Sequence, residues 1–144
     1  MALTLCVVDE SEASPAAVAA AIDFCREHDA ELMLLGIVRP ILGVTQPAYG
    51  ERVRRFLAVE FAVVQAARAA REAGFEPSIL IRAGDPARES LREADAIGAT
   101  EIFLGRARGL LSARLTRRPR LDVLRMTRPP AARREAEGEL AEAA

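Results

Sequence analysis

The chain has 144 residues, of which 51% are hydrophobic and 28% charged, a composition that can bury the core of one domain. Its net charge of -1 argues against a general nucleic-acid-binding protein, and no apolar run approaches the roughly 20 residues that span a bilayer. Cys6 and Cys25 both fall in apolar patterns. We therefore expect two reduced core thiols in a cytoplasmic protein without membrane contact.

The first half of the chain predicts two buried strands around a helix. The apolar run LTLCVV at residues 3–8 is typical of a strand buried on both faces. Ser14 and Pro15 suit the start of a helix, and apolar residues recur at helical spacing up to about His28. ELMLLGIV at residues 31–38 predicts the second strand, and the loop of residues 39–50 follows it.

The middle of the chain continues the alternation. Residues 51–74 predict a long helix, with an apolar face formed by Val53, Phe56, Leu57, Val63, Val64 and Ala67. PSILIR at residues 77–82 predicts the third strand. Asp85 is the expected N-cap of the next helix, which ends at Gly98, and EIFL at residues 101–104 predicts the fourth strand.

The C-terminal part predicts a last helix over residues 120–126 and a mobile tail over residues 128–144, which leaves a domain of residues 1–127. Strands that alternate with helices predict a single-domain α/β fold, with a parallel sheet of four to five strands and helices on both faces. Ligands bind such sheets at the carboxyl ends of the strands. That edge would carry Asp9, residues 37–40, residues 83–85 and residues 105–109.

Three segments together resemble the universal stress protein family, over roughly residues 3–126. VVDESEAS at 7–14 is similar to the family's first-strand signature, and AELMLLGIVRP at 30–40 is similar to its second strand. RAGDPARESLREADAIGATEIFLG at 82–105 looks like its G-D-P turn, third helix and fourth strand. The resemblance implies a Rossmann-like fold and a site for ATP or AMP.

The resemblance also implies a set of nucleotide-contacting positions. Nucleotide-binding members of the family carry G-x2-G-x9-G-[ST] after the fourth strand, where glycines and a helix N-terminus receive the phosphates. Gly105 matches the first glycine, Gly109 stands one residue late for the second, and Arg117-Arg118 replace the final pair. The candidate nucleotide site comprises Val8, Asp9, Ile37, Gly105, Gly109, Arg117 and Arg118.

Each candidate also has a plainer interpretation. Asp9 either contacts the nucleotide or caps the turn into the first helix. Ile37 either presents its backbone to adenine or only packs in the core. The arginines around Arg117 and Arg118 bind phosphate, form a solvated surface, or contact acidic segments. Nucleic acid is a weaker hypothesis, because no aromatic residue lies within this cluster for base stacking.

The family usually continues into a fifth strand that forms the dimer contact, whereas this chain continues into Pro129-Pro130 and charged residues. We therefore expect a sheet of four strands, or one that borrows an edge, and a homodimer that does not use a C-terminal strand.

Enzyme chemistry has little support in the sequence. Neither G-x-x-x-x-G-K-[ST] nor G-x-G-x-x-G is present, and one histidine with two cysteines is too few for a zinc site. Our first hypothesis is a regulatory domain that has lost or weakened nucleotide binding and acts through contacts with an unidentified protein partner. The alternatives are an ATP- or AMP-binding stress-response protein and, least favoured, a slow nucleotide hydrolase.

Overall fold

The computed structural model of the chain describes residues 2–10, 14–40, 48–105 and 123–127. It contains a five-stranded sheet in the order β3-β2-β1-β4-β5. The strands are β1 (Leu3–Val8), β2 (Glu31–Val38), β3 (Ser78–Ala83), β4 (Glu101–Gly105) and β5 (Val123–Thr127). The helices are α1 (Ser14–His28), α2 (Tyr49–Glu72) and α3 (Pro86–Ile97). The first four strands are parallel, so the predicted α/β architecture is confirmed.

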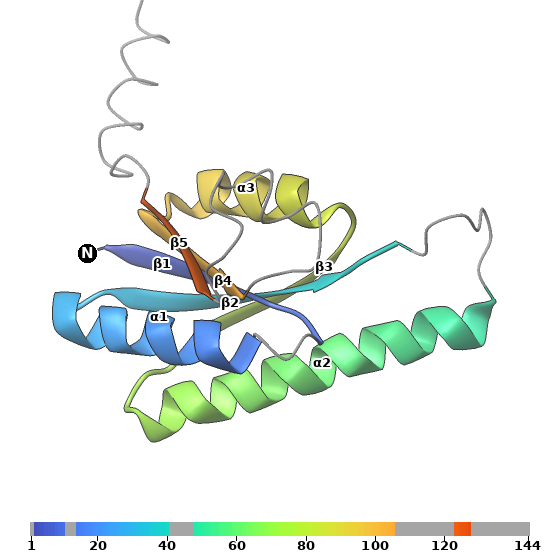
Figure 1. The fold of residues 1–144 in the computed structure, drawn as a ribbon, viewed down its shortest axis with the longest axis horizontal. Helices are drawn as coiled ribbons and strands as arrows, with labels where there is room; N and C mark the ends of the chain where they lie inside the picture. Colours follow the sequence, from blue (N-terminus) through green and yellow to red (C-terminus); the bar gives the residue numbers. More distant parts are fainter. Residues whose placement is uncertain (1, 11–13, 41–47, 106–122, 128–144) are drawn as a thin grey trace, which may run out of the picture.

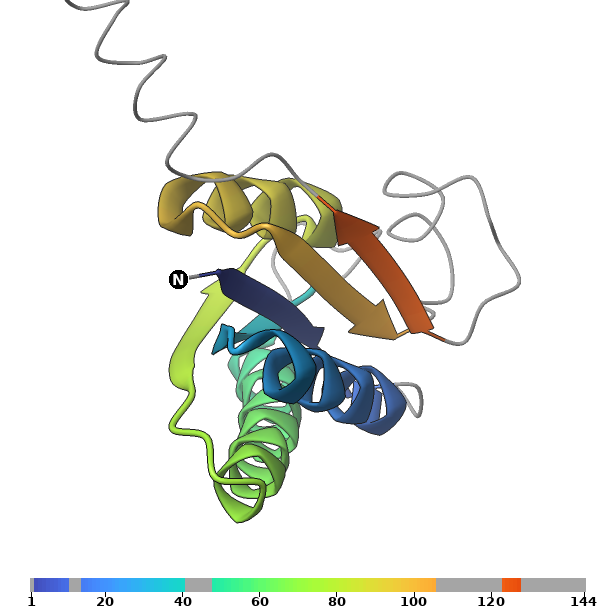
Figure 2. The ribbon, with the colours of Figure 1, turned by 90° about the vertical axis from the view of Figure 1, so that its left-hand side faces the viewer.

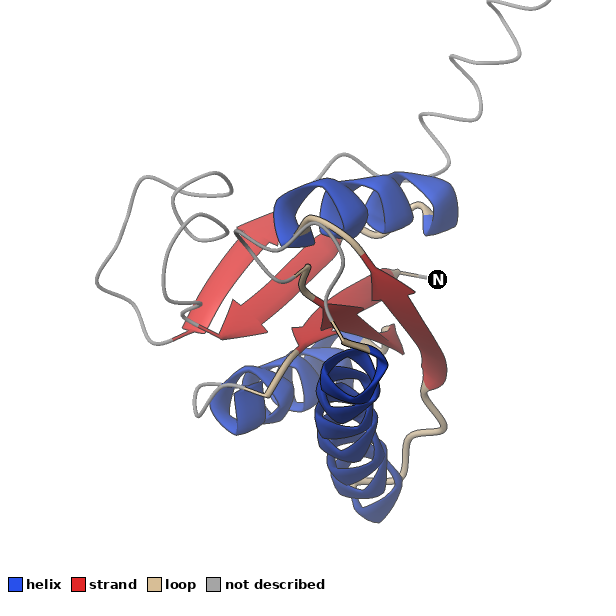
Figure 3. Ribbon diagram, turned by 90° about the vertical axis from the view of Figure 1, so that its right-hand side faces the viewer, coloured by secondary structure: helices blue, strands red, loops and turns tan. Residues whose placement is uncertain are grey.

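The sheet lies between two helical layers, with α1 and α2 on one face and α3 on the other (Figures 1 and 3). The strands are buried on both faces because successive side chains point to opposite layers. In β1, Cys6 and Val8 pack in the α1–α2 layer, whereas Leu5 and Val7 pack in the α3 layer. Both cysteines are buried and free, as the sequence predicts.

The fifth strand corrects two predictions. Residues 120–126 were expected to form a helix, but residues 123–127 form β5, which runs antiparallel along β4 (Figure 2). The sheet was expected to end at β4 or to borrow an edge, whereas β5 of the same chain pairs with β4 from Gly105↔Val123 to Glu101↔Thr127. A strand in this position satisfies backbone groups of β4 that would otherwise need another partner. The predicted tail, residues 128–144, lies outside the described residues.

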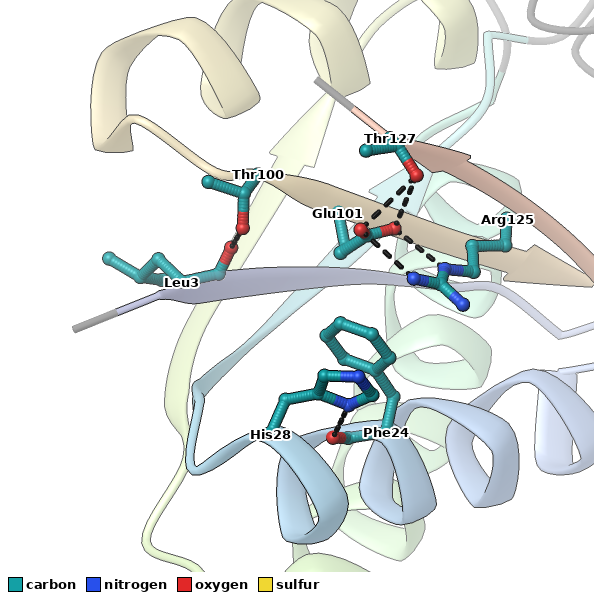
Figure 4. A network of polar contacts seen from close by, with 7 residues as sticks. All are labelled: Leu3, Phe24, His28, Thr100, Glu101, Arg125 and Thr127. Atoms are coloured by element: carbon teal, nitrogen blue, oxygen red, sulfur yellow. Dashed lines mark hydrogen bonds and ion pairs between the residues drawn. The ribbon is translucent and has the colours of Figure 1, made fainter. Parts of the chain in front are cut away.

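A buried carboxylate ties β5 to β4 (Figure 4). Glu101 accepts hydrogen bonds from Arg125 Nε at 2.7 Å and Arg125 Nη2 at 3.1 Å, and from the hydroxyl of Thr127 at 3.1 Å. The Arg125 guanidinium also lies over the ring of Phe24, 4.3 Å from its centroid. Hydrogen bonding to Glu101 raises the pKa of Arg125 above its ordinary value. These contacts explain why VLRMT is a strand here: its central arginine compensates the buried charge of β4.

The long helix also departs from its predicted packing. Val63 and Ala67 are buried as expected, but Phe56, Leu57 and Val64 are exposed. The side of α2 that packs on the sheet carries Val59, Val63, Ala66, Ala67 and Ala70. Leu57 and Val64 lie on the opposite side of the helix. None of the described helices is both long and apolar enough to span a bilayer.

Both predicted ends of α3 are confirmed. The carboxylate of Asp85 accepts a hydrogen bond from the backbone N–H of Arg88 at 3.0 Å, and Pro86 occupies the first helical turn. Gly98 ends the helix in the left-handed conformation, with φ of 68°.

We expect Asp85→Ala to lower the free energy of unfolding by about 0.5–2 kcal/mol, because one N–H of the first turn loses its partner. The measurement is urea denaturation followed by circular dichroism. Asp85→Asn is the matched control, since asparagine caps about as well as aspartate. Equal losses in the two variants would show that capping is not what Asp85 contributes.

Candidate functional site

Four of the predicted site residues meet at one edge of the sheet. Val8 and Gly105 are the last residues of β1 and β4, and the register pairs Val7 with Leu104 directly before them. Val8 pairs with Gly36 of β2, which places Ile37 one residue further along. Asp9 follows β1 directly. The carboxyl ends of the four parallel strands thus gather these positions on one edge, where ligands bind in α/β sheets.

The other three predicted residues, Gly109, Arg117 and Arg118, lie outside the described residues. The structure therefore describes only those candidate site residues that lie at the strand ends, namely Val8, Asp9, Ile37 and Gly105.

Asp9 is held by two neighbours rather than open to solvent. Its carboxylate accepts a hydrogen bond from the Ser14 hydroxyl at 2.9 Å and another from Arg39 Nη2 at 3.2 Å. The backbone N–H of Asp9 donates in turn to the Ser14 hydroxyl at 3.0 Å. Only 13% of the Asp9 side chain is exposed. The aspartate thus joins the start of α1 to the residues after β2.

Arg39 was expected at this edge as one of residues 37–40, but it was not among the predicted nucleotide-contacting residues. It directly follows β2, and its backbone carbonyl lies 3.5 Å from Arg55 Nη1 of α2. Its ion pair with Asp9 brings a cation to the strand-end edge. The sequence carried a signal for this contact, because residues that follow neighbouring parallel strands emerge at the same edge.

The side chains of Val8 and Ile37 are buried in opposite layers. Val8 packs with α1 and α2, and Ile37 packs on the α3 side. Only their backbone groups are therefore placed to meet a ligand at the strand ends. For Ile37 this agrees with the backbone role that the resemblance implies, and also with simple core packing.

At the end of β3, the polar groups of the following turn are already used in hydrogen bonds within the chain. Gly84 has φ of 148° and donates its N–H to the carbonyl of Val38 at 3.1 Å. Asp85 uses its carboxylate as the cap of α3. This part of the predicted edge therefore shapes the turn between β3 and α3.

The sulfur and imidazole groups are poorly suited to catalysis. Burial raises the pKa of the Cys6 thiol to about 12 and also raises the pKa of Cys25, so both stay protonated near neutral pH. His28 ends α1, where its ring stacks on Phe24 at a centroid distance of 4.1 Å (Figure 4). This is the end opposite to the carboxyl ends of the strands, as the helix prediction implied. Within the described residues, no cluster of three or more histidines, cysteines and carboxylates is placed to hold a metal.

Comparisons with known proteins agree on the family. The model of the universal stress protein family matches residues 4–126. Among solved structures, the chain is similar to a universal stress family protein from Burkholderia pseudomallei, at 20% identity and a TM-score of 0.68, covering 83% of this chain and 90% of that one. None of the curated proteins compared with the chain matches it.

Two further similar structures are described with a bound nucleotide. A universal stress protein in complex with cAMP is 19% identical, with a TM-score of 0.62 over 84% of this chain and 93% of that one. An Arabidopsis thaliana family protein with AMP bound is 15% identical, with a TM-score of 0.57 over 83% and 87%. With the family model matching most of its length, the chain belongs to the universal stress protein family.

Proposed function

We propose that this chain is a cytoplasmic regulatory domain of the universal stress protein type in which nucleotide binding is weakened or lost, and which acts through contacts with other proteins. The main support for the proposal is that the Asp9 carboxylate already accepts hydrogen bonds from Ser14 and Arg39 of the same chain.

A nucleotide that used Asp9 would have to displace one of these partners. The pair with Arg39 is a charge-assisted hydrogen bond, the stronger kind, and the Asp9 side chain is largely shielded from water. Glu10 is exposed directly beside it and adds a negative charge near the strand ends, which disfavours phosphate. Both effects lower the affinity expected for ATP more than for a smaller ligand.

ATP or AMP binding is the second candidate. Two similar structures are described with cAMP and AMP, and Arg39 is the observation in this chain that favours it. One third of its side chain is exposed, so its guanidinium can turn from Asp9 toward a phosphate. Nucleotide hydrolysis gains no support, because the histidine lies at the far end of α1 and Asp9 is engaged.

Titration calorimetry with AMP, ATP and cAMP tests the first candidate against the second. We expect dissociation constants of about 10 µM to 1 mM or weaker for wild type. Arg39→Ala should bind adenosine nucleotides at least as well as wild type, because Asp9 is released. Wild-type binding tighter than about 1 µM, lost in Arg39→Ala, would make Arg39 a phosphate ligand and establish the second candidate.

The arginine pair that replaces the family's Gly-Ser requires a separate titration. If arginines have taken over phosphate binding, the Arg117→Ala/Arg118→Ala double variant should lose the weak binding of wild type for ATP, AMP and inorganic phosphate. Arg92→Ala/Arg88→Ala on α3 is a control for net charge alone. No wild-type binding at millimolar ligand would remove the nucleotide hypothesis and leave LGRARGLLSARLTRRPR at residues 104–120 as a relic of the family's phosphate-binding segment.

A further inference from the structure

α2 runs antiparallel to β2, and its first turns project beyond the strand-end edge of the sheet (Figure 1). Val59 packs over Gly36 of β2, since a Cβ atom added at that glycine would lie 3.0 Å from Val59 Cγ1. Arg52 lies two helical turns before Val59, about 10.5 Å along the helix axis. From Gly36, β2 continues for only about 6.6 Å to its last residue, Val38. The helix therefore extends past the end of β2 at Arg52.

Two residues on the sheet-facing side of α2 are exposed because β2 ends before it reaches them. Arg52 and Phe56 precede Val59 by seven and three residues, so all three share one side of the helix. Val59 is buried, whereas Arg52 is exposed and Phe56 is 43% exposed. Next to them, Arg55 donates from Nη1 to the carbonyl of Arg39, directly after β2, at 3.5 Å. We call Arg52, Arg55 and Phe56 the α2 overhang.

The two arginines of the α2 overhang have little of their charge neutralised. Arg55 Nε lies 3.8 Å from an oxygen of Glu51, a carboxylate that Arg54 holds more closely at 3.0 Å. Arg52 has no hydrogen bond or ion pair within the part of the chain that the structure describes. An exposed guanidinium without a carboxylate, beside a second one that is only loosely paired, is suited to bind a phosphate through several N–H groups.

We propose that the α2 overhang receives the phosphate of a small phosphate monoester at the strand ends, and that the ring of this ligand lies on Phe56. The arginines supply charge-assisted donors, and the partly exposed aromatic ring supplies a flat apolar surface. The phosphate then approaches from α2, whereas the family's pattern places it after β4, where this chain has Arg117-Arg118 in place of the final pair. This assignment rests on the weak ligand binding proposed above and names the residues that carry it.

A small ligand suits this surface better than a protein does. The overhang comprises three side chains, far fewer than the roughly 20–30 residues that each partner contributes to a stable protein interface. It also adjoins the carboxyl ends of the parallel strands, where small molecules bind in α/β sheets. Inorganic phosphate would use only the arginines, so the exposed ring of Phe56 favours an ester that carries a ring of its own.

NMR titration of the full-length chain with AMP, a phosphate monoester that carries a ring, tests the assignment. We expect Arg52→Ala to lower the association constant for AMP by at least about 5-fold, because a charge-assisted hydrogen bond is lost. Adenosine, which has no phosphate, should bind this variant and wild type equally. Phe56→Ala should weaken the binding of both ligands by about 2- to 10-fold, because both carry the ring.

Matched controls remove the same groups from the opposite side of α2. Arg68→Ala and Phe61→Ala replace an exposed arginine and an exposed phenylalanine that face away from the sheet, and both variants should bind AMP as wild type does. All four substituted residues are exposed, so the circular dichroism spectra and thermal midpoints should change little.

The assignment is overturned if Arg52→Ala and Arg68→Ala bind AMP equally well. It is also overturned if Arg117→Ala/Arg118→Ala abolishes AMP binding while Arg52→Ala retains it. No wild-type binding at about 10 mM AMP would overturn it too, but the proposed loss of nucleotide binding would then stand. Wild-type binding tighter than about 1 µM that is lost in Arg52→Ala would support the α2 overhang and contradict the proposed weakening of nucleotide binding.

Discussion

Arg125→Ala is expected to lower the free energy of unfolding by about 2–3 kcal/mol, because it leaves the buried charge of Glu101 without its cation. The Glu101 side chain is 7% exposed and accepts two hydrogen bonds from the guanidinium. Arg125 itself is 48% exposed, so water can partly replace it, and we expect less than the full loss for a fully buried pair. Urea denaturation monitored by circular dichroism gives the value.

Two comparisons separate the buried charge from simple loss of contacts. Arg71→Ala breaks an exposed pair, in which Arg71 Nη2 lies 3.2 Å from Glu76 Oε1, and should cost about 1 kcal/mol or less. Arg125→Met combined with Glu101→Leu should be less destabilising than Arg125→Ala, because no charge remains unpaired. A loss for Arg125→Ala no greater than that for Arg71→Ala would show that the stability of the fold does not depend on pairing the Glu101 charge.

The sequence predicted those elements whose signals are local. β1 and β2 have the predicted bounds because each is an apolar run buried on both faces. α3 begins and ends as predicted because Asp85, Pro86 and Gly98 determine its ends by their own chemistry. β5 was missed because its conformation depends on a partner elsewhere in the chain, Glu101. Read alone, LDVLRM also suits a helix.

The same distinction holds at the candidate site and on α2. Asp9 lies at the strand ends, as predicted. Its ion pair with Arg39 was not predicted, because that contact depends on how the ends of β1 and β2 are placed relative to each other. The predicted apolar face of α2 included residues from both sides of the helix, because the order of apolar residues alone does not say which side of the helix packs on the sheet. Leu57 and Val64 are the residues that this ambiguity misplaced.

Gly36→Val is expected to destabilise the fold by about 3 kcal/mol, because α2 packs against the backbone of β2 at this glycine. A Cβ atom added at Gly36 would lie 2.7 Å from Val63 Cγ2 and 3.0 Å from Val59 Cγ1. Both valines are buried, so neither can move into solvent. A glycine within a strand pattern is the sequence signal for such a close approach. The control Gly50→Ala has no neighbour within 4 Å and should be neutral or stabilising by up to about 1 kcal/mol.

A double-mutant cycle tests whether Val63 is the obstacle. Val63→Ala alone should destabilise the fold by leaving a cavity, and in the Gly36→Val background it should remove the closest clash and fill that cavity. The double variant should therefore be more stable than the sum of the two single effects by about 0.5–3 kcal/mol. Denaturant melts of the four proteins give the coupling free energy. Additive effects would mean that α2 moves away from β2 as a unit, so that the spacing between helix and sheet is not fixed by this contact.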